Sequence, residues 1–286
     1  MAFLRLPMRA CRGKFVTPIG ATTHRIMLED DFTYVLRKAL IGHALAPAEA
    51  AAQAGLPDHE VLAFLRGTFA AATARQLAPV LGLNATAFAS HATYQPKPLA
   101  VAGITRLDLP FGGDQVNAWL ASAGSTTILF DAGFEPRGLL DKVALHRHRL
   151  PERAFISHAH HDHIGALQYL LAAGVPVHAA AIPGTIPMQA GDTVCCGPLV
   201  VRACDLSGHS TPALGFHIDG LGQPVLVTGD ALFAGSMGGC GSPAIYQHAL
   251  RRLREVLAPL PDATVLLPGH GPPTTLGEER AANPFL

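Results

Sequence analysis

The stretch Ser157-His158-Ala159-His160-His161-Asp162-His163-Ile164-Gly165 decides how the sequence is interpreted. It places four histidines and one carboxylate within six positions, directly after the apolar run Ala154-Phe155-Ile156. A short apolar run of this kind predicts a buried strand. From Ile164 to Ala173 apolar residues recur at helical spacing, and Gly174 stands where a helix would end. The cluster is therefore expected on a turn between a strand and a helix, where side chains can converge.

Imidazoles and carboxylates this close together are costly to hold unless a cation binds them, and a divalent metal is the simplest such cation. A His-rich solvated loop is the alternative interpretation. Three further strand-like segments weaken that alternative, because each is followed by a loop with glycine beside His or Asp. The segments are Leu199 to Ala203 before His209, Val225 to Val227 before Asp230, and Thr264 to Leu267 before His270. In layered α/β proteins, function collects in such loops at strand ends.

Composition excludes several classes of protein. The 286 residues are 49% hydrophobic and carry 21 basic and 21 acidic side chains, so no global field favours nucleic acid or acidic lipid. No apolar run approaches the roughly eighteen residues that span a bilayer. Five cysteines without Cys-x-x-Cys spacing favour a reducing compartment over a disulfide framework. We therefore expect a cytoplasmic protein without a membrane partner.

The chain divides into four parts. Residues 1–26 hold five basic residues and no acid, and we expect them to be a disordered extension or a misassigned start. From 27 to 92, apolar spacing with Gly and Pro signals predicts five short helices. Residues 93–99 form a linker that proline stiffens. Residues 100–286 have the apolar patterns of strands and contain all of the His and Asp residues described above as candidate ligands.

The five predicted helices, with a tight Gly55-Leu56-Pro57 turn, resemble a Cro/cI-type helix-turn-helix domain. DNA binding requires Lys and Arg against phosphates. Residues 27–92 instead hold four basic and six acidic side chains, a balance of −2, and Asp58 and Glu60 open the helix that would face DNA. These charges argue against a nucleic-acid partner and favour a packing, dimerisation or lid module. A DNA-binding regulator with a metal-binding sensor domain is the non-enzyme alternative.

The helical segment 27–92 has more large apolar side chains than a bundle of this size can bury by itself. We expect them to cover the C-terminal part of the chain or a second copy of it, which leaves a homodimer open. The side chains are Phe32, Leu36, Leu40, Phe64, Phe69 and Phe88.

The motif His158-x-His160-x-Asp162-His163, with His209, Asp230 and His270 after it, resembles the metallo-β-lactamase superfamily from about residue 100 onward. The segments 228–233 (Thr-Gly-Asp-Ala-Leu-Phe) and 268–272 (Pro-Gly-His-Gly-Pro) resemble its glyoxalase II-like branch. The resemblance implies an α/β protein with an αββα sandwich, here preceded by a small all-α helical bundle. It also implies two divalent metal ions in a cleft at one edge, with zinc first and iron or manganese as alternatives.

The resemblance assigns a role to each matching position. It puts His158, His160 and His209 on the first metal, Asp162, His163 and His270 on the second, and Asp230 between them. It gives catalytic roles to Asp162 and Asp230. Asp131, in an Asp-x-Gly turn, would orient a ligand through a hydrogen bond, and a turn-capping role is the alternative. His161 occupies a variable position of the motif, and we expect its side chain to point away from the metals.

The function implied by the resemblance is dinuclear metal-dependent hydrolysis of a thioester, as in hydroxyacylglutathione hydrolases, or of a related ester. A metal-bridging hydroxide would attack the carbonyl of this small-molecule substrate. Lactonase and phosphodiesterase activities are alternatives in the same superfamily, as is a persulfide dioxygenase with one iron on His158, His209 and Asp230. True class B1 β-lactamases carry cysteine where this sequence has Asp230. Glyoxalase II enzymes bind glutathione on a C-terminal helical domain, whereas sixteen residues follow His270 here, so the acyl and thiol groups stay open.

Overall fold

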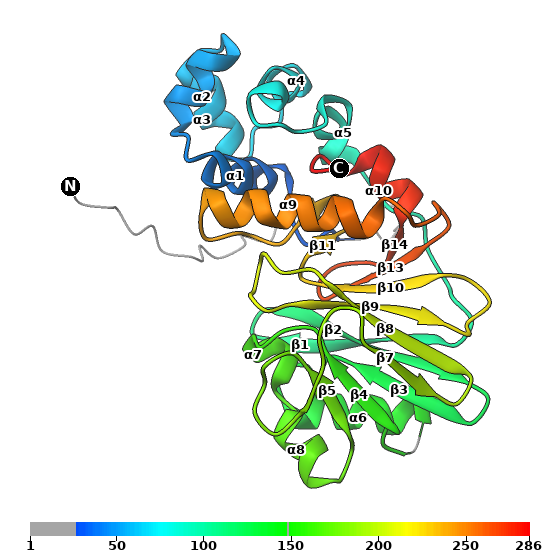
Figure 1. Ribbon diagram of the computed structural model, residues 1–286. Coiled ribbons are helices and arrows are strands. Elements are labelled where there is room, and N and C mark those ends of the chain that lie inside the picture. Colours follow the sequence, from blue (N-terminus) through cyan, green and yellow to red (C-terminus); the bar gives the residue numbers. More distant parts are fainter. Residues whose placement is uncertain (1–26, 148) are drawn as a thin grey trace, which may run out of the picture.

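The computed structural model describes residues 27–147 and 149–286. The disordered extension expected over residues 1–26 lies outside the described part of the chain. Two six-stranded sheets pack against each other, and helices cover both outer faces (Figure 1). This arrangement is the expected αββα sandwich, and a helical region precedes it along the chain.

The first sheet has the strand order β1-β2-β3-β4-β5-β6. Its strands are β1 (Ile104–Phe111), β2 (Asp114–Ala123), β3 (Thr126–Phe130), β4 (Arg153–Ile156), β5 (Val177–Ala179) and β6 (Ile186–Pro187). The pairs from β1 to β3 are antiparallel, and those from β3 to β6 are parallel. The helices between these strands are α6 (Pro136–Arg147), α7 (His161–Ile164) and α8 (Leu167–Ala172).

The second sheet has the strand order β14-β13-β10-β9-β8-β7. Its strands are β7 (Thr193–Cys196), β8 (Leu199–Asp205), β9 (Leu214–Asp219), β10 (Val225–Gly229), β13 (Val265–Pro268) and β14 (Thr274–Thr275). Because β9 is antiparallel to both β8 and β10, and β13 is parallel to β10, the strands β8, β10 and β13 run in one direction. The remaining elements are the hairpin β11 (Leu232–Phe233) and β12 (Ser236–Met237), then α9 (Pro243–Leu257) and α10 (Leu276–Ala282).

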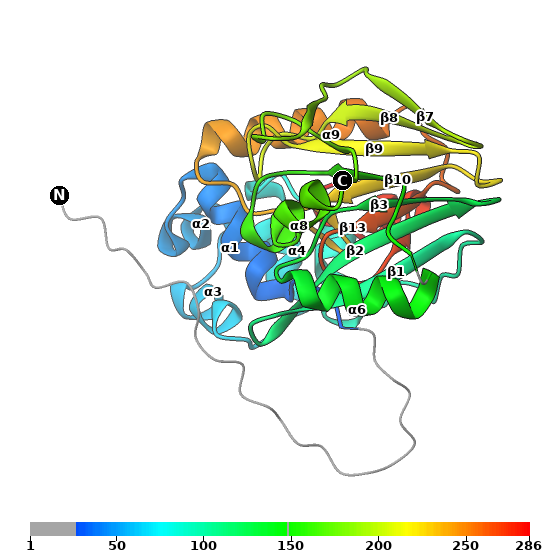
Figure 2. The same ribbon diagram turned by 90° about the horizontal axis from the view of Figure 1, so that it is seen from below.

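Strand side chains alternate between two cores, as the two-residue period of a strand requires. In β3, Phe130 faces the space between the sheets, while Leu129 faces the helices on the outer side of the first sheet. In β10, Val227 likewise points between the sheets and Leu226 points toward α9. Figure 2 shows α6 against the first sheet and α9 against the second. The sequence runs that are apolar at every position are therefore strands buried on both faces.

The N-terminal region consists of short helices that lie on α9 and α10. They are α1 (Phe32–His43), α2 (Pro47–Ala54), α3 (Asp58–Leu65), α4 (Ala71–Val80), α5 (Ala85–Ser90) and the 3₁₀ turn η1 (His91–Thr93). One apolar cluster joins Leu36 and Phe64 of this region to Leu253 of α9 and to Phe285. The expected packing of these apolar residues onto the C-terminal part of the chain is confirmed. The helix-turn-helix resemblance of α2 and α3 stays a prediction.

The predicted helix from Ile164 to Ala173 is wrong in its bounds. The structure has two short helices there, α7 and α8, which are separated at Gly165 and Ala166. The N–H of Gly165 donates to the Gly133 carbonyl at 2.6 Å, and that of Ala166 donates to the Ala132 carbonyl at 3.1 Å. A Cβ at Gly165 would lie 1.9 Å from the Phe134 carbonyl oxygen. The turn after β3 thus takes the hydrogen bonds that a continuous helix would have used.

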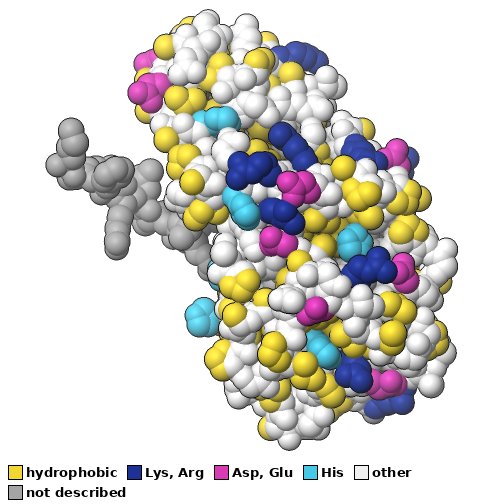
Figure 3. All heavy atoms as spheres, viewed as in Figure 1, with side chains coloured by type: hydrophobic (Ala, Val, Ile, Leu, Met, Phe, Trp, Pro, Cys, Tyr) yellow, Lys and Arg dark blue, Asp and Glu magenta, His cyan; other side chains and the backbone are white. Residues whose placement is uncertain are grey.

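The outward face of α9 is polar. Arg251 and Arg254 are exposed, and Arg252 pairs with Asp205 of β8 at 3.2 Å. Figure 3 shows Lys and Arg side chains mixed with Asp and Glu over this face. Among the described residues, no helix combines the length and apolarity needed to cross a membrane.

Candidate metal centre

Four strand ends bring the candidate ligands together at one edge of the sandwich. His158, His160, Asp162 and His163 follow β4 of the first sheet, while His209, Asp230 and His270 follow β8, β10 and β13 of the second. The three strands of the second sheet run in one direction, so their C-terminal ends share an edge. All seven predicted ligands fall into two adjoining groups in which the ligand atoms lie within 4.8 Å of one another.

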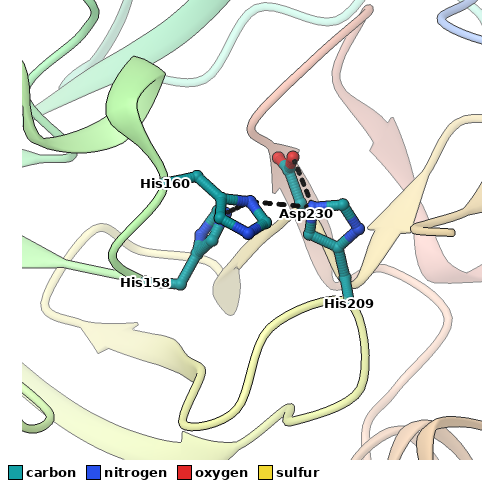
Figure 4. Close-up of side chains that lie close together, drawn as sticks. All are labelled: His158, His160, His209 and Asp230. Carbon is teal, nitrogen blue, oxygen red and sulfur yellow. Dashed lines mark hydrogen bonds and ion pairs between the residues drawn. The ribbon is translucent and has the colours of Figure 1, made fainter. Parts of the chain in front are cut away.

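The first group consists of His158, His160, His209 and Asp230 (Figure 4). The Nδ1 atom of His160 lies 3.0 Å from Nε2 of His158 and 3.0 Å from Nε2 of His209. The Oδ2 atom of Asp230 lies 3.5 Å from Nε2 of His209. Three imidazole nitrogens and one carboxylate oxygen therefore face a common point.

The second group consists of Asp162, His163 and His270. The Nε2 atom of His270 lies 3.2 Å from Oδ2 of Asp162 and 3.5 Å from Oδ2 of Asp230. The Nε2 atom of His163 lies 3.3 Å from Oδ1 of Asp230. The Asp230 carboxylate therefore contacts both groups.

These spacings fit a bound cation. Two nitrogens on one tetrahedral zinc, each at about 2.0–2.1 Å from the metal, are themselves about 3.3 Å apart. The separations of 3.0 to 3.5 Å in both groups lie close to that value. In addition, Nε2 of His163 and Oδ1 of Asp230 are buried, and although they lie 3.3 Å apart, neither atom makes a hydrogen bond of good geometry. Buried polar atoms in this state are costly unless an ion satisfies them, so the residues fit a metal.

The outer nitrogens of three histidines are held by the protein. Nδ1 of His209 lies 3.0 Å from the Gly239 carbonyl, and Nδ1 of His270 lies 2.9 Å from the Gln115 carbonyl. A carbonyl only accepts, so each Nδ1 carries a proton, which leaves Nε2 as the atom that can ligate a metal. Nδ1 of His163 lies 2.9 Å from the Asp131 carboxylate, with the same consequence.

Electrostatics keep part of the first group neutral. Burial, together with the nearby His163, lowers the pKa of His158 to about 2, and burial also lowers the pKa of His209. Burial acts in the same direction on His163, but the carboxylates of Asp230 and Asp131 outweigh it and raise its pKa well above the usual value. Despite burial, His163 in turn holds the pKa of Asp230 well below the usual range. The two carboxylates therefore favour protonation of His163, and a metal ion would compete with that proton.

Asp131 orients ligands of both groups. Its Oδ1 accepts from the Ser157 N–H at 2.7 Å, and its Oδ2 accepts from the Ser157 hydroxyl at 2.9 Å and from His163. The Ser157 oxygen is then free to accept from Nδ1 of His158 at 2.9 Å. Asp131 also has a left-handed φ of 59° in the turn after β3. Asp131 therefore has both features considered from the sequence: it accepts a hydrogen bond from a candidate ligand, and it occupies a turn.

We expect Asp131→Asn to weaken metal binding, because three donors point at the Asp131 carboxylate and an amide cannot accept all of them. Asparagine tolerates left-handed φ, so the turn should persist, whereas Asp131→Ala should also strain it. Metal affinity, measured by competition with a chelator, should fall about 10- to 100-fold in both variants. Full affinity in Asp131→Asn with a loss only in Asp131→Ala would show that the turn alone matters.

The structure also places residues that the sequence prediction did not assign. Asn117 of β2 is buried, and its side-chain N–H groups donate to the Pro268 carbonyl at 2.9 Å and the Gly271 carbonyl at 2.8 Å, on either side of His270. Ser157 links Asp131 to His158 as described above. An isolated Asn or Ser has no sequence signal that distinguishes this role. His161, by contrast, is exposed as predicted.

Comparison with known proteins supports this fold. The Metallo-beta-lactamase superfamily matches residues 111–195, and the chain belongs to this superfamily. A hydroxyacylglutathione hydrolase of Gloeobacter violaceus is 33% identical over 46% of this chain and 68% of that protein.

Solved structures share the fold over about two thirds of this chain. The BLEG-1 B3 metallo-beta-lactamase has a TM-score of 0.55 and 25% identity, and covers 64% of this chain and 99% of its own. The protein TTHA1623 in a di-iron-bound form has a TM-score of 0.51 and 32% identity, and covers 63% of this chain and 99% of its own.

Proposed function

We propose that this protein is a dinuclear metal-dependent hydrolase of a thioester, similar to hydroxyacylglutathione hydrolases, or of a related small-molecule ester. The position of Asp230 carries the proposal. Its carboxylate lies 3.5 Å from His209 of the first group and 3.3 and 3.5 Å from His163 and His270 of the second. One carboxylate between two ligand groups is the arrangement expected for two metal ions that share a ligand.

Two bound dications would polarise a substrate carbonyl and lower the pKa of a water molecule to near neutrality. The protein contributes a ligand set in which imidazoles outnumber carboxylates, five to two, so the loaded site keeps net positive charge. Such a site favours the negative charge that develops on the carbonyl oxygen during acyl transfer.

Asp162 is the carboxylate that we assign to proton transfer. Burial raises its pKa, but the hydrogen bond from His270 and the charges of His163 and His270 together outweigh this effect and lower the pKa below the usual value. Asp162 is therefore ionised at neutral pH and can accept a proton from water. The Nδ1 atom of the neighbouring His270 donates to the Gln115 carbonyl, and this hydrogen bond limits the movement of the His270–Asp162 pair.

The substrate class rests on similarity and on leaving-group chemistry. The relative from Gloeobacter violaceus is a hydroxyacylglutathione hydrolase. A thiolate is a good leaving group and needs little assistance from an acid, and the two groups hold no neutral carboxylic acid, because the pKa values of both Asp162 and Asp230 are lowered. This favours a thioester over an alkyl ester.

We expect purified protein to bind two metal ions per chain and to cleave a thioester faster than an oxyester, a lactone or a phosphodiester. Metal content is measured by mass spectrometry, and the substrate panel is run before and after chelation. Chelation should lower the rate at least about 10³-fold, a modest part of usual enzymatic accelerations. If the protein instead binds one iron per chain and consumes oxygen when glutathione persulfide is added, the activity is that of a dioxygenase and the hydrolase proposal is wrong. Full activity without metal would contradict both.

A further inference from the structure

We propose that the N-terminal helical region is a working part of the metal centre, because Lys38 and His91 hold the β11–β12 hairpin that positions His209. Lys38 and His91 are in this sense positioning residues, acting on the centre through the backbone of the hairpin. This inference depends on one part of the proposed function, namely that the two ligand groups bind metal ions.

The hairpin lies between Asp230 of the first ligand group and two glycines that lie against His209 of the same group. It begins two residues after Asp230 and is followed at once by Gly238 and Gly239. The Gly239 carbonyl contacts Nδ1 of His209 at 3.0 Å, and the Gly238 N–H donates to the Ala231 carbonyl at 3.3 Å. A Cβ at Gly238 would lie 1.9 Å from the Asp230 carbonyl oxygen and 2.7 Å from Cβ of His209. The loop therefore passes directly over the ligands, and a small displacement of it displaces His209.

Lys38 of α1 reaches the end of the hairpin. Its Nζ donates to the Met237 carbonyl at 2.7 Å and pairs with the buried Asp30 carboxylate. The ammonium also lies 5.4 Å from the centre of the Phe233 ring. Only 16% of the Lys38 side chain is exposed, so these contacts are poorly screened by solvent. Met237 is the residue directly before Gly238, and a restraint on its carbonyl is passed to the next two peptides.

His91 holds the turn of the same hairpin. It is buried, and its Nε2 lies 2.9 Å from the Gly235 carbonyl. The Gly235 N–H donates to Glu279 of α10 at 2.8 Å, and Glu279 also accepts from the Tyr94 hydroxyl at 2.7 Å. Asn283 donates to the Ser236 carbonyl at 3.0 Å. The hairpin is thus held on one side by the N-terminal region and on the other by the C-terminal helix.

These contacts form a short path from α1 to the metal centre: Lys38, the Met237 carbonyl, the Gly239 carbonyl and His209. If the helices only packed against the rest of the chain, their apolar contacts with α9 would be sufficient, and this path of hydrogen bonds would not be needed. The path predicts a specific consequence. Loss of the Lys38 ammonium should loosen the first ligand group without unfolding the helical region.

The test compares Lys38→Met with Arg37→Met in the full chain. Both variants remove one cation from α1, but Arg37 donates to the Leu65 carbonyl within the helical region at 2.7 Å and does not contact the hairpin. Zinc affinity is measured by competition with a chromophoric chelator. We expect Lys38→Met to weaken one of the two zinc sites about tenfold, at the lower end of the effect of losing a direct hydrogen bond to a ligand. Arg37→Met should bind zinc like the wild type, and Lys38→Arg should recover most of the affinity.

Equal zinc affinity in Lys38→Met and in the wild type would overturn the proposal, and so would an equal loss in Arg37→Met. Backbone hydrogen exchange of residues 231–241 in the metal-free proteins is a second measurement, which does not depend on metal. Exchange there should be faster in Lys38→Met and unchanged in Arg37→Met, and unchanged exchange in both variants would also overturn the proposal. If the wild type binds no metal, the proposed function fails, and hydrogen exchange still decides whether Lys38 holds the hairpin.

Discussion

Asp230→Ala should empty both ligand groups and reduce hydrolysis to background. The carboxylate is buried and lies within 3.5 Å of histidines in both groups, so its removal takes a ligand from each. It also removes one of the two carboxylates that contact the buried His163. We expect less than one metal ion per chain and a fall in rate of at least about 10³-fold. Metal content and hydrolysis are measured on the same preparation.

Asp230→Asn and Asp219→Ala are the matched controls. Asparagine keeps the volume of Asp230 but supplies one acceptor oxygen instead of two, so at least one group should still lose its metal. Asp219 is an exposed carboxylate at the end of β9, and its replacement should leave metal content and rate unchanged. Two metals and normal hydrolysis in Asp230→Ala would contradict the shared-ligand proposal. Similar losses in Asp219→Ala would show that the assay reports folding.

Deletion of residues 1–92 should make the remaining chain poorly soluble or change its oligomeric state. The deletion uncovers side chains that now pack against the N-terminal helices, including Leu250 and Leu253 of α9, Leu276 of α10 and Phe285 after α10. Burial of one large apolar side chain contributes about 1.5–3 kcal/mol, so exposure of several would consume most of the stability of an ordinary domain. Solubility and size-exclusion chromatography with light scattering measure the result.

Arg37→Met is the control for that deletion, because it changes the helical region without uncovering α9. A truncated chain that is soluble, monomeric and unchanged in thermal unfolding would contradict the prediction. All seven predicted ligands lie outside the deleted segment. Metal retained by the truncated chain at reduced affinity would agree with the positioning role proposed for Lys38.

Local patterns in the sequence were sufficient for the N-terminal helices and for the four strands that end at candidate ligands. Apolar face spacing with Pro and Gly signals predicted the five N-terminal helices. The structure adds that Asn84 caps α5 by accepting hydrogen bonds from the N–H groups of Thr86 and Ala87. Apolar runs that end in His or Asp predicted β4, β8, β10 and β13. These features depend on residues a few positions apart, so the sequence displays them directly.

The grouping of the seven ligands depended on the family resemblance, because residues 158 and 270 are far apart along the chain. The break between α7 and α8 was missed, since the hydrogen-bond acceptors for Gly165 and Ala166 lie in the turn after β3. The contacts of Lys38 and His91 were missed for the same reason: their partners lie 199 and 144 residues away. Periodicity, caps and strand ends are local properties that a sequence carries by itself. Which backbone carbonyl a buried Lys, His or Asn side chain contacts is decided only when distant elements pack together.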